Sequence, residues 1–416
     1  MNLASTRAAA RVLLAADASR RDAALAAIEH SLATHREAVL SANVADVGQA
    51  RAAGMAAVML DRLTLDSKRY DAMLASVREV RALPDPLGEE RTPWLRPNGL
   101  RITKRRIPLG VIAVVYEARP NVTVEAATLA IKSGNAMVLR GGKEAMGSNR
   151  ALVAAVRAGL ETAGFPADAV TFIDDPSRDR VIELLGAVGQ VDLVIPRGGI
   201  ELMKMVDAHA RVPVIRHGQG ICHVFLDATA DADMAERIVF NAKVQRPGVC
   251  NSTETLLVHR DHLANGLLAR VARKLVDEGR VELRVDEETA QVLHANDIAF
   301  VPASADDWDT EFLALILAIR VVPSLDAAID HIAAHGSHHT ASILTHDEQH
   351  AERFLREVDA SCVLWNASTR FNDGNELGLG AEIGISTSKM HAFGPMGLRE
   401  LTAEKFVVYG DGQARG

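Results

Sequence analysis

Short apolar runs alternate with helical stretches from Gly110 to a helix beyond Gly199, and this alternation constrains the fold more than any other feature of the sequence. The runs cover residues 111–116, 136–140, 170–173 and 191–195. They are apolar almost throughout instead of alternating with polar residues, which is typical of strands buried on both faces. Strands of this kind, joined by helices, predict a parallel sheet with helices on both faces, which is a doubly wound α/β fold.

A second α/β pattern begins near Val224. A helical stretch over residues 232–243 leads into a loop at 245–252 and a strand at 255–259, and further helices and strands continue to Trp365. Residues 366–394 are rich in Gly, Ser, Thr and Asn, which is typical of loops that carry active-site residues. We therefore predict two doubly wound parallel-sheet domains, over residues 1–225 and 226–397.

The N-terminal region predicts helices followed by a projecting ribbon. Residues 1–73 are Ala-rich with apolar residues at helical spacing. Asn98-Gly99 is a strong hairpin signal ahead of the strand-like residues 100–108. Because a two-stranded hairpin is marginal alone, we predict that residues 95–110 form a small β oligomerisation arm and that the chain is a homo-oligomer. A C-terminal strand within residues 398–416 is expected to join this arm.

Composition argues against several classes of partner. The formal net charge is −8, and the one basic cluster, at residues 104–106, lies in the predicted ribbon, so nucleic acid is a poor candidate. No apolar run is long enough to span a bilayer, and the N-terminus lacks the features of a signal peptide. Three cysteines do not make a disulfide framework. We therefore expect a cytoplasmic protein with no membrane partner.

Cys250 is the candidate nucleophile. It lies in the polar loop QRPGVCNST at 245–253, which contains Gly, Pro and Arg and separates a predicted helix from a predicted strand. A thiol needs such a setting to become a thiolate, which is the reactive form. The alternative is a small buried filler residue, which is what we predict for Cys222 and Cys362.

A second candidate site follows the strand predicted at 136–140. Arg140, Gly141, Gly142 and Lys143 lie between that strand and a helix. Glycines let a backbone approach a phosphate, a helix N-terminus attracts negative charge, and two cations would suit the 2′-phosphate of NADP. The dinucleotide fingerprint GxGxxG is absent, so simple turn glycines stay open as the alternative.

Two polar clusters in the C-terminal half each admit two interpretations. Histidines at positions 331, 335, 338 and 339 lack the HExxH pattern, so they favour a helix end and turn, and we predict no bound metal. The loop at 366–373 offers amide, hydroxyl and guanidinium donors that suit a carboxylate or phosphate, among them Ser368, Thr369 and Arg370. A polar surface turn would have the same composition.

Longer motifs assemble into one pattern that spans nearly the whole chain. They are YEARPNVTV at 116–124, KSGNAMVLRGGKE at 132–144, VIPRGG at 194–199, QRPGVCNSTET at 245–255, NASTRFNDG at 366–374 and GPMGL at 394–398, together with the histidine cluster. With these motifs the chain resembles the γ-glutamyl phosphate reductase (glutamate-5-semialdehyde dehydrogenase) family of the aldehyde dehydrogenase superfamily. One departure is Ala341, where the family usually has an acid.

The resemblance implies an aldehyde dehydrogenase-like fold and an NADPH-dependent oxidoreductase. The implied reaction converts L-glutamyl 5-phosphate to L-glutamate 5-semialdehyde and phosphate through a thioester on Cys250, the second step of proline biosynthesis. Residues 1–225 would bind NADP(H), and residues 226–397 would form the catalytic domain. The implied cofactor-binding residues are Arg140, Gly141, Gly142, Lys143, Gly198, Gly199 and Glu311, and the implied substrate-binding residues are Asn121, Ser368, Thr369 and Arg370. Docking with glutamate 5-kinase, which makes the unstable acyl phosphate, follows as an expectation.

One absence agrees with the reductive direction. Hydrolytic aldehyde dehydrogenases carry a Glu-Leu-Gly-Gly segment whose glutamate activates water, whereas the comparable stretch RHGQG, at 216–220, has no acid. Water attack on a thioester would waste substrate, so a reductase gains from this absence. Two alternatives stay open: an acylating dehydrogenase that exchanges acyl groups with coenzyme A, and a catalytically idle interaction module, against which the intact cysteine loop argues.

Overall fold

The computed structural model describes residues 1–216 and 218–415, apart from the side chains of Val58 and Ile200. The chain forms two compact units: Met1–Arg216 with Gly378–Gly384 and Met396–Gly416, and His217–Leu377 with Ile385–Pro395. The second unit starts before residue 226, because the strand Cys222–Leu226 pairs with strands of the second sheet. Residues 378–384 belong to the first unit, although they lie within the range predicted for the catalytic domain.

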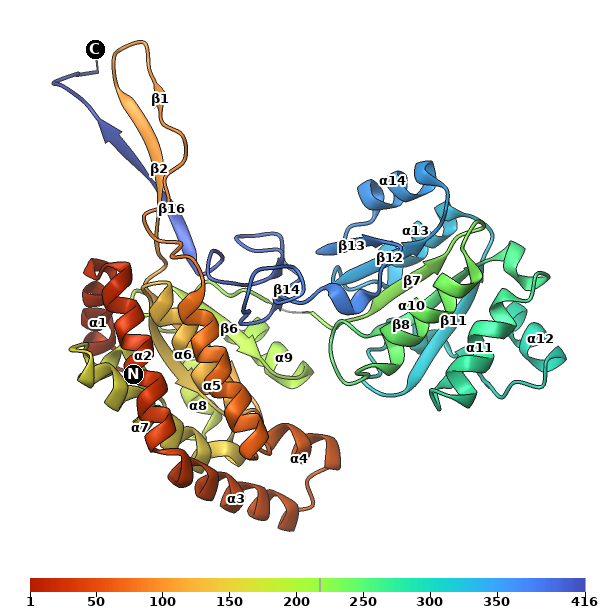
Figure 1. Cartoon of the computed structure of the whole chain (residues 1–416), viewed down its shortest axis with the longest axis horizontal. Coiled ribbons are helices and arrows are strands. Elements are labelled where there is room, and N and C mark those ends of the chain that lie inside the picture. The colour runs from red at the N-terminus through yellow and green to blue at the C-terminus, as the bar shows by residue number, and fades with distance from the viewer. Residues whose placement is uncertain (217, 416) are drawn as a thin grey trace. The chain divides into compact units, whose positions relative to one another are not determined.

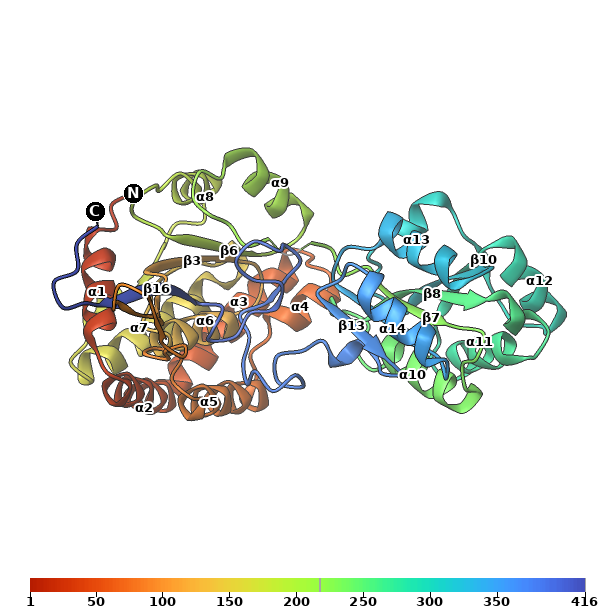
Figure 2. The same ribbon diagram turned by 90° about the horizontal axis from the view of Figure 1, so that it is seen from above.

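The first unit is built on a parallel sheet with the strand order β5-β4-β3-β6. Its strands are β3 (Val111–Tyr116), β4 (Ala136–Arg140), β5 (Val170–Phe172) and β6 (Leu193–Arg197). Every residue of β3 and β4 is buried, as expected of apolar strands covered on both faces. In Figure 2 this sheet lies between α8 and α9 on one side and α2, α5, α6 and α7 on the other, which confirms the predicted doubly wound arrangement.

Helices make up most of the rest of the first unit. Asp17 and Asp66 begin two of them by accepting the backbone N–H of Arg20 and of Arg69, which satisfies donors that the first helical turn leaves free. The helices are α1 (Ala4–Ala15), α2 (Ala18–Thr34), α3 (Arg36–Ala52), α4 (Ala57–Leu63), α5 (Ser67–Ala82), α6 (Asn121–Lys132), η1 (Lys143–Ala145), α7 (Met146–Thr162), η2 (Ala167–Ala169), α8 (Arg178–Leu185) and α9 (Ile200–His209).

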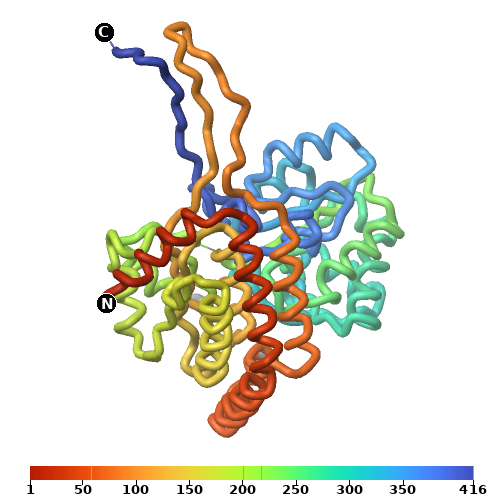
Figure 3. The backbone as a smooth tube through the Cα atoms, turned by 60° about the vertical axis from the view of Figure 1, so that its left-hand side comes forward, coloured from red at the N-terminus to blue at the C-terminus, as the bar shows by residue number. Residues whose placement is uncertain are grey.

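A three-stranded antiparallel ribbon extends from the helices of the first unit (Figures 1 and 3). Strand β2 (Arg101–Pro108) pairs with β1 (Trp94–Leu95) on one side and with β16 (Thr402–Tyr409) on the other. The hairpin predicted at 95–110 is present. Beyond β1, on the side away from the Asn98-Gly99 turn, an isolated bridge joins Glu90 to Arg105. We call this ribbon the arm.

The second unit is built on a seven-stranded parallel sheet with the order β10-β9-β11-β8-β7-β12-β13. Val224 and Leu226 pack among the side chains of α10, α11 and α12, whereas Phe225 packs with those of α13 and α14, because successive strand residues point to opposite faces. The strands are β7 (Cys222–Leu226), β8 (Thr253–His259), β9 (Glu282–Val285), β10 (Val301–Pro302), β11 (Ile316–Val322), β12 (Thr340–Leu344) and β13 (Cys362–Trp365). The helices are α10 (Ala232–Val244), η3 (Arg260–Leu263), α11 (Leu267–Asp277), α12 (Glu287–Ala295), η4 (Ala305–Asp309), α13 (Leu325–His335), α14 (Glu348–Glu357) and η5 (Thr369–Phe371).

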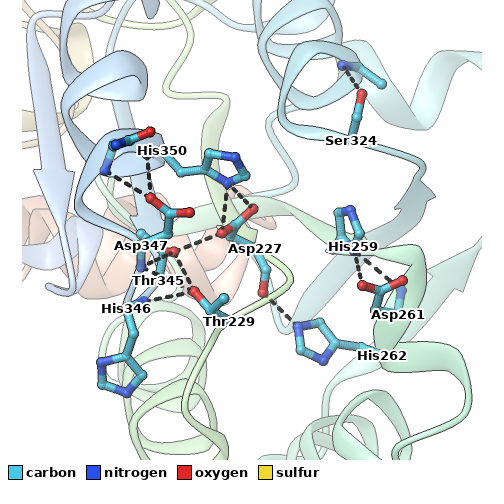
Figure 4. A network of polar contacts seen from close by, with 12 residues as sticks. Asp227, Thr229, His259, Asp261, His262, Ser324, Thr345, His346, Asp347 and His350 are labelled. Atoms are coloured by element: carbon cyan, nitrogen blue, oxygen red, sulfur yellow. Dashed lines mark hydrogen bonds and ion pairs between the residues drawn. The ribbon is translucent and has the colours of Figure 1, made fainter.

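The carboxyl edge of the second sheet is closed by its own side chains. Ligands usually bind at this edge where the strand order reverses, which here is between β7 and β12. Asp227, directly after β7, is fully buried and accepts hydrogen bonds from the Thr345 hydroxyl and the His350 ring. Thr229 and His262 extend the network, as Figure 4 shows. These residues thus bind one another at the carboxyl edge of the second sheet.

Two smaller features complete the described chain. A short antiparallel pair, β14 (Ile385–Ser386) with β15 (Gly394–Pro395), closes the C-terminal part of the second unit. Within residues 1–216 and 218–415, no helix combines the length and apolar character needed to cross a membrane.

Candidate active site

Cys250 lies in the loop that joins α10 to β8, at the amino edge of the second sheet. The thiol-bearing residue is half-buried and sits in a turn closed by a hydrogen bond from Ser252 N–H to the Val249 carbonyl. Gly220 passes so close to it that a Cβ at position 220 would lie 2.0 Å from the Cys250 carbonyl oxygen. Gly220, the last residue of the stretch at 216–220 that lacks an acid, therefore lies against the backbone of the candidate nucleophile; His217 within that stretch lies outside the described residues.

A second thiol, that of Cys222, contacts the Cys250 loop. Cys222 is fully buried, and its Sγ donates to the carbonyl oxygen of Cys250 at 3.1 Å and lies 3.4 Å from Nδ1 of His339. Burial raises the pKa of the Cys222 thiol, which keeps the proton that this hydrogen bond needs. Cys222 is buried as predicted, but it also contacts the catalytic loop, a role that its apolar sequence context did not indicate.

Asparagine side chains join the catalytic loop to two other segments. The Asn251 amide donates to the carbonyl of Asn372 at 3.0 Å, and the Asn372 amide donates to the Thr340 hydroxyl at 2.8 Å. Both asparagines are almost fully buried. The loop at 366–373, the histidine segment before β12 and the Cys250 loop thus meet in one cluster. The sequence offered no signal for the asparagine pairing itself.

Arg370 brings a guanidinium to the same cluster. The Ser368 hydroxyl accepts the Arg370 backbone N–H, and Nε of Arg370 donates to Gln245 Oε1 at 2.7 Å, which fixes the plane of the fork. Burial lowers the pKa of Arg370, and the nearby charge of Arg246 lowers it further. Two guanidinium groups at this loop suit an anion. Arg246 and Gln245 were not among the predicted site residues.

Thr369 and Glu311 complete the predicted set in the second unit. Thr369 is fully buried, so its side chain does not contact bulk solvent. Its hydroxyl has no hydrogen-bond partner among the described residues. Glu311 is half-buried in the segment before β11. Its charge raises the pKa of both members of the ion pair that Lys243 forms with Glu254.

The two cations predicted in the first unit, Arg140 and Lys143, differ in their exposure to solvent. Arg140 is buried, and its Nη atoms donate to the carbonyl oxygens of Gly141, at 3.1 Å, and of Pro176, at 2.6 Å. Burial lowers the pKa of Arg140. Its Nε is buried with no hydrogen-bond partner among the described residues. Lys143, by contrast, is exposed. Arg140 therefore braces the end of β4, and Lys143 is the cation that an external phosphate could reach.

Close neighbours account for the two glycines in the loop after β4. A Cβ at Gly141 would lie 2.1 Å from the Asn149 amide nitrogen, and one at Gly142 would lie 2.1 Å from a Glu144 carboxylate oxygen. Glu144 also accepts the N–H of Ala118 at 2.6 Å. Tight packing within the unit thus explains both residues, in addition to the predicted approach of a phosphate.

The crevice between β3 and β6 is where the strand order of the first sheet reverses, so it is the expected place for a dinucleotide. Gly198 and Gly199 follow β6 and lead into α9, and Gly199 N–H donates to the Glu117 carboxylate at 3.0 Å. Among the described residues, nothing lies within 4 Å of a Cβ built at Gly199, so this turn keeps an open face at the carboxyl end of β6. With Lys143 exposed and Arg140 Nε unpartnered at the end of neighbouring β4, the residues present fit a nicotinamide dinucleotide.

Asn121 is the first residue of α6 in the first unit. Its side-chain amide donates to Glu125 one turn later at 2.8 Å, and the side chain is half-buried. The contact leaves the amide oxygen available, while one N–H is already used within the helix.

Comparison with known proteins shows the family to which the chain belongs. The aldehyde dehydrogenase family model matches residues 2–296. The chain therefore belongs to the aldehyde dehydrogenase family, whose fold binds a nicotinamide cofactor. The acetylating aldehyde dehydrogenase of Geobacillus thermoglucosidasius, 16% identical, covers 100% of this chain and 96% of its own with a TM-score of 0.70, which concerns the fold alone.

Within that family the chain belongs to the γ-glutamyl phosphate reductases. The γ-glutamyl phosphate reductase of Anaeromyxobacter dehalogenans is 55% identical over 99% of this chain and 96% of its own length. The crystal structure of the γ-glutamyl phosphate reductase of Thermotoga maritima is 44% identical and covers 100% of this chain and 99% of its own with a TM-score of 0.95. The resemblance that the motifs indicated is confirmed, and the chain is an oxidoreductase.

Proposed function

We propose that the chain reduces L-glutamyl 5-phosphate to L-glutamate 5-semialdehyde and phosphate with NADPH, the second step of proline biosynthesis. The observation that carries the proposal is the Cys250 loop, in which a half-buried thiol-bearing residue is held by Cys222 beside Arg370. The names of the relatives at 50% identity or more, all γ-glutamyl phosphate reductases, support the substrate.

The Cys250 thiolate attacks the acyl carbon of the substrate, so that an S–C bond forms and the bond from that carbon to the phosphate oxygen breaks. Phosphate leaves as an anion, and Arg370 with Ser368 and Thr369 holds the phosphate or the amino-acid end of the substrate. The backbone N–H of Cys250 stabilises the tetrahedral oxyanion, and loss of such a donor costs roughly two to three powers of ten in rate. Asn121 is a further substrate-binding residue in this proposal.

Residues of the first unit and Glu311 hold the cofactor. NADPH, when bound, supplies the hydride that converts the thioester to the aldehyde. Lys143 would pair with the 2′-phosphate, Arg140 would keep the loop at Gly141 and Gly142 in place, and Gly198 with Gly199 would form the turn near the nicotinamide. Glu311 would accept hydrogen bonds from the hydroxyls of the nicotinamide ribose.

The assay that decides this proposal runs in the oxidative direction with glutamate 5-semialdehyde, NADP and inorganic phosphate. Phosphate-dependent NADP reduction is expected, because phosphate must attack the thioester to complete the cycle. Cys250→Ala is expected to abolish turnover and to keep NADPH binding measured by fluorescence. A variant that retains substantial turnover, or a wild-type enzyme that reduces NADP equally well without phosphate, would contradict the proposal.

The same assay separates the alternatives. A coenzyme A-acylating dehydrogenase would require coenzyme A in place of phosphate, and an idle interaction module would show neither activity. The intact loop around Cys250, with three supporting contacts from Cys222, Asn251 and Gly220, argues against idleness because an interaction module needs none of them.

Further observations concern the assembly of the chain and its location in the cell. The arm exposes Leu95, Phe406 and Val408, which suits a homo-oligomer. Docking with glutamate 5-kinase stays a prediction that rests on the instability of the acyl phosphate. The three cysteines form no disulfide among the residues that the structure describes, which agrees with a reducing compartment such as the cytoplasm.

A further inference from the structure

A buried ion pair connects the two ends of the catalytic loop. Lys243 is the second-last residue of α10, and Glu254 is the second residue of β8. Nζ of Lys243 donates to Oε2 of Glu254, and neither side chain has exposed surface. Burying two charges costs several kcal/mol per ion, and apolar residues of similar size often give an equally stable protein. Stability alone therefore does not account for this pair.

A β-bulge directs Glu254 toward Lys243. Cys222 of β7 pairs with Thr253, and the next residue, His223, pairs with Thr255, so that Glu254 is the additional residue in β8. Bulges occur often beside active sites, where the additional residue redirects a side chain. The irregularity lies four residues after Cys250 and next to Cys222, whose thiol supports the Cys250 carbonyl.

The second carboxylate oxygen of Glu254 contacts a third segment. Oε1 accepts the backbone N–H of Leu313 at 3.2 Å. Leu313 has φ of 51°, a left-handed conformation that is uncommon for a bulky residue and that needs support from its surroundings. Glu311 lies two residues earlier, and its charge acts on the pKa of both members of the pair. One carboxylate therefore joins α10, β8 and the segment that carries Glu311.

We propose that Lys243 and Glu254 are positioning residues that hold the Cys250 loop and the Glu311 segment in one arrangement. The pair fixes the start and the end of the loop that carries the nucleophile, and it fixes the backbone beside the acid expected to hold the nicotinamide ribose. The roles of Cys250 and Glu311 come from the proposed function, on which this inference rests.

Two double variants separate the contacts of Glu254. K243M/E254Q removes both charges and leaves an oxygen that can accept from Leu313, whereas K243M/E254M removes that acceptor as well. Changing both partners avoids the unpaired buried charge that destabilises single variants. Asp227→Asn is the matched control, because Asp227 is equally buried and lies at the opposite edge of the same sheet.

Three measurements on the full-length chain test the proposal. They are the rate of Cys250 alkylation by iodoacetamide, followed by peptide mass spectrometry, the kcat and KM for NADP in the phosphate-dependent assay, and the melting curve by circular dichroism. Misplacement of a reacting group by about 1 Å can cost about a hundredfold in rate. We expect both double variants to fold and to lose about this factor in kcat together with a slower alkylation of Cys250, and only K243M/E254M to raise the KM for NADP.

The control decides between positioning and general loosening. Asp227→Asn is expected to melt at a lower temperature while Cys250 keeps its wild-type alkylation rate. Wild-type alkylation and kcat in folded K243M/E254M, or an equal loss in Asp227→Asn, would overturn the proposal. If K243M/E254M does not fold, K243M/E254Q carries the same test of Cys250. Because alkylation needs no substrate, it stays informative even if the wild-type protein shows no phosphate-dependent activity, a result that would count against the proposed function only.

Discussion

Lys143 is the cation that solvent reaches at the end of β4, whereas the guanidinium of Arg140 is committed to backbone carbonyls. Preference for NADPH should therefore depend on Lys143. Charge-assisted contacts contribute about 1.5–3 kcal/mol, and each 1.4 kcal/mol is about tenfold in affinity. Lys143→Ala is expected to raise the KM for NADPH about tenfold or more and to leave the KM for NADH unchanged in steady-state assays.

Arg150→Ala provides the control for this prediction. Arg150 is another exposed cation that follows the same loop, but its guanidinium pairs with Asp174. It should change neither KM. An equal rise in the KM for NADH in Lys143→Ala would assign Lys143 to the shared part of the dinucleotide instead.

The candidate site could be predicted in part from single residues. Cys250 was predicted because a thiol in a polar loop with Gly and Pro is unusual, and Arg370 because its loop combines amide, hydroxyl and guanidinium donors. Cys222 was not, because it looks like any apolar strand residue, and its partners Cys250 and His339 are 28 and 117 residues away. Glu254 is the one acid in the buried part of β8, which could have drawn attention to it, but only the bulge shows where its side chain points.

At the scale of elements, α13 and β7 meet through histidines. His331 of α13 and His223 of β7 are both buried, with ring centroids 5.5 Å apart, and Trp308, Arg320 and His335 surround His331. Burial lowers the pKa of His223 to about 4, and burial with the neighbouring rings and Arg320 lowers that of His331 to about 2.

This pair predicts a loss of stability in acid. Above the unfolded pKa of about 6.5 both states leave the rings neutral, but between pH 6.5 and 4 the unfolded chain binds protons that the folded chain does not. His223→Gln should therefore reduce the pH-dependent fall in the free energy of unfolding between pH 7 and pH 4 by about 3 kcal/mol. Urea denaturation at the two pH values, followed by tryptophan fluorescence, measures it. An unchanged difference between the two pH values would contradict the assignment.

Element positions followed the sequence best where strands are buried on both faces. The runs at 111–116 and 136–140 match β3 and β4 in full, because no polar face interrupts them. The run predicted at 191–195 is shifted, since β6 spans Leu193–Arg197 and includes Pro196. Proline is tolerated there because β6 lies at the end of the strand order in its sheet. Single-sequence patterns do not show which strand takes that place.

At the scale of the whole molecule, the arm presents apolar side chains that no element within the described part of the chain covers. Leu95 is 72% exposed and Phe406 63% exposed, and Trp94 packs edge-on against Phe406. If the arm joins subunits, a charge there should prevent association. Phe406→Asp with Leu95→Asp is expected to lower the mass measured by light scattering to that of a single chain.

Val44→Asp is a suitable comparison for the arm variant. Val44 is 73% exposed on α3, where it stands outside the arm, so its substitution should leave the mass unchanged. An arm variant that keeps the wild-type mass would show that another surface joins the subunits.

The pairing of β2 with β16 also means that β2 is synthesised long before the strand that pairs with it. Arg105 and Tyr409 contact each other across 304 residues of sequence. At about 5–20 residues per second, β2 waits roughly 15 to 60 s for its neighbour to be synthesised. The second unit is translated entirely within that interval. β16 is therefore synthesised after the whole second unit, so a nascent chain exposes one unpaired edge of β2 until β16 has been made.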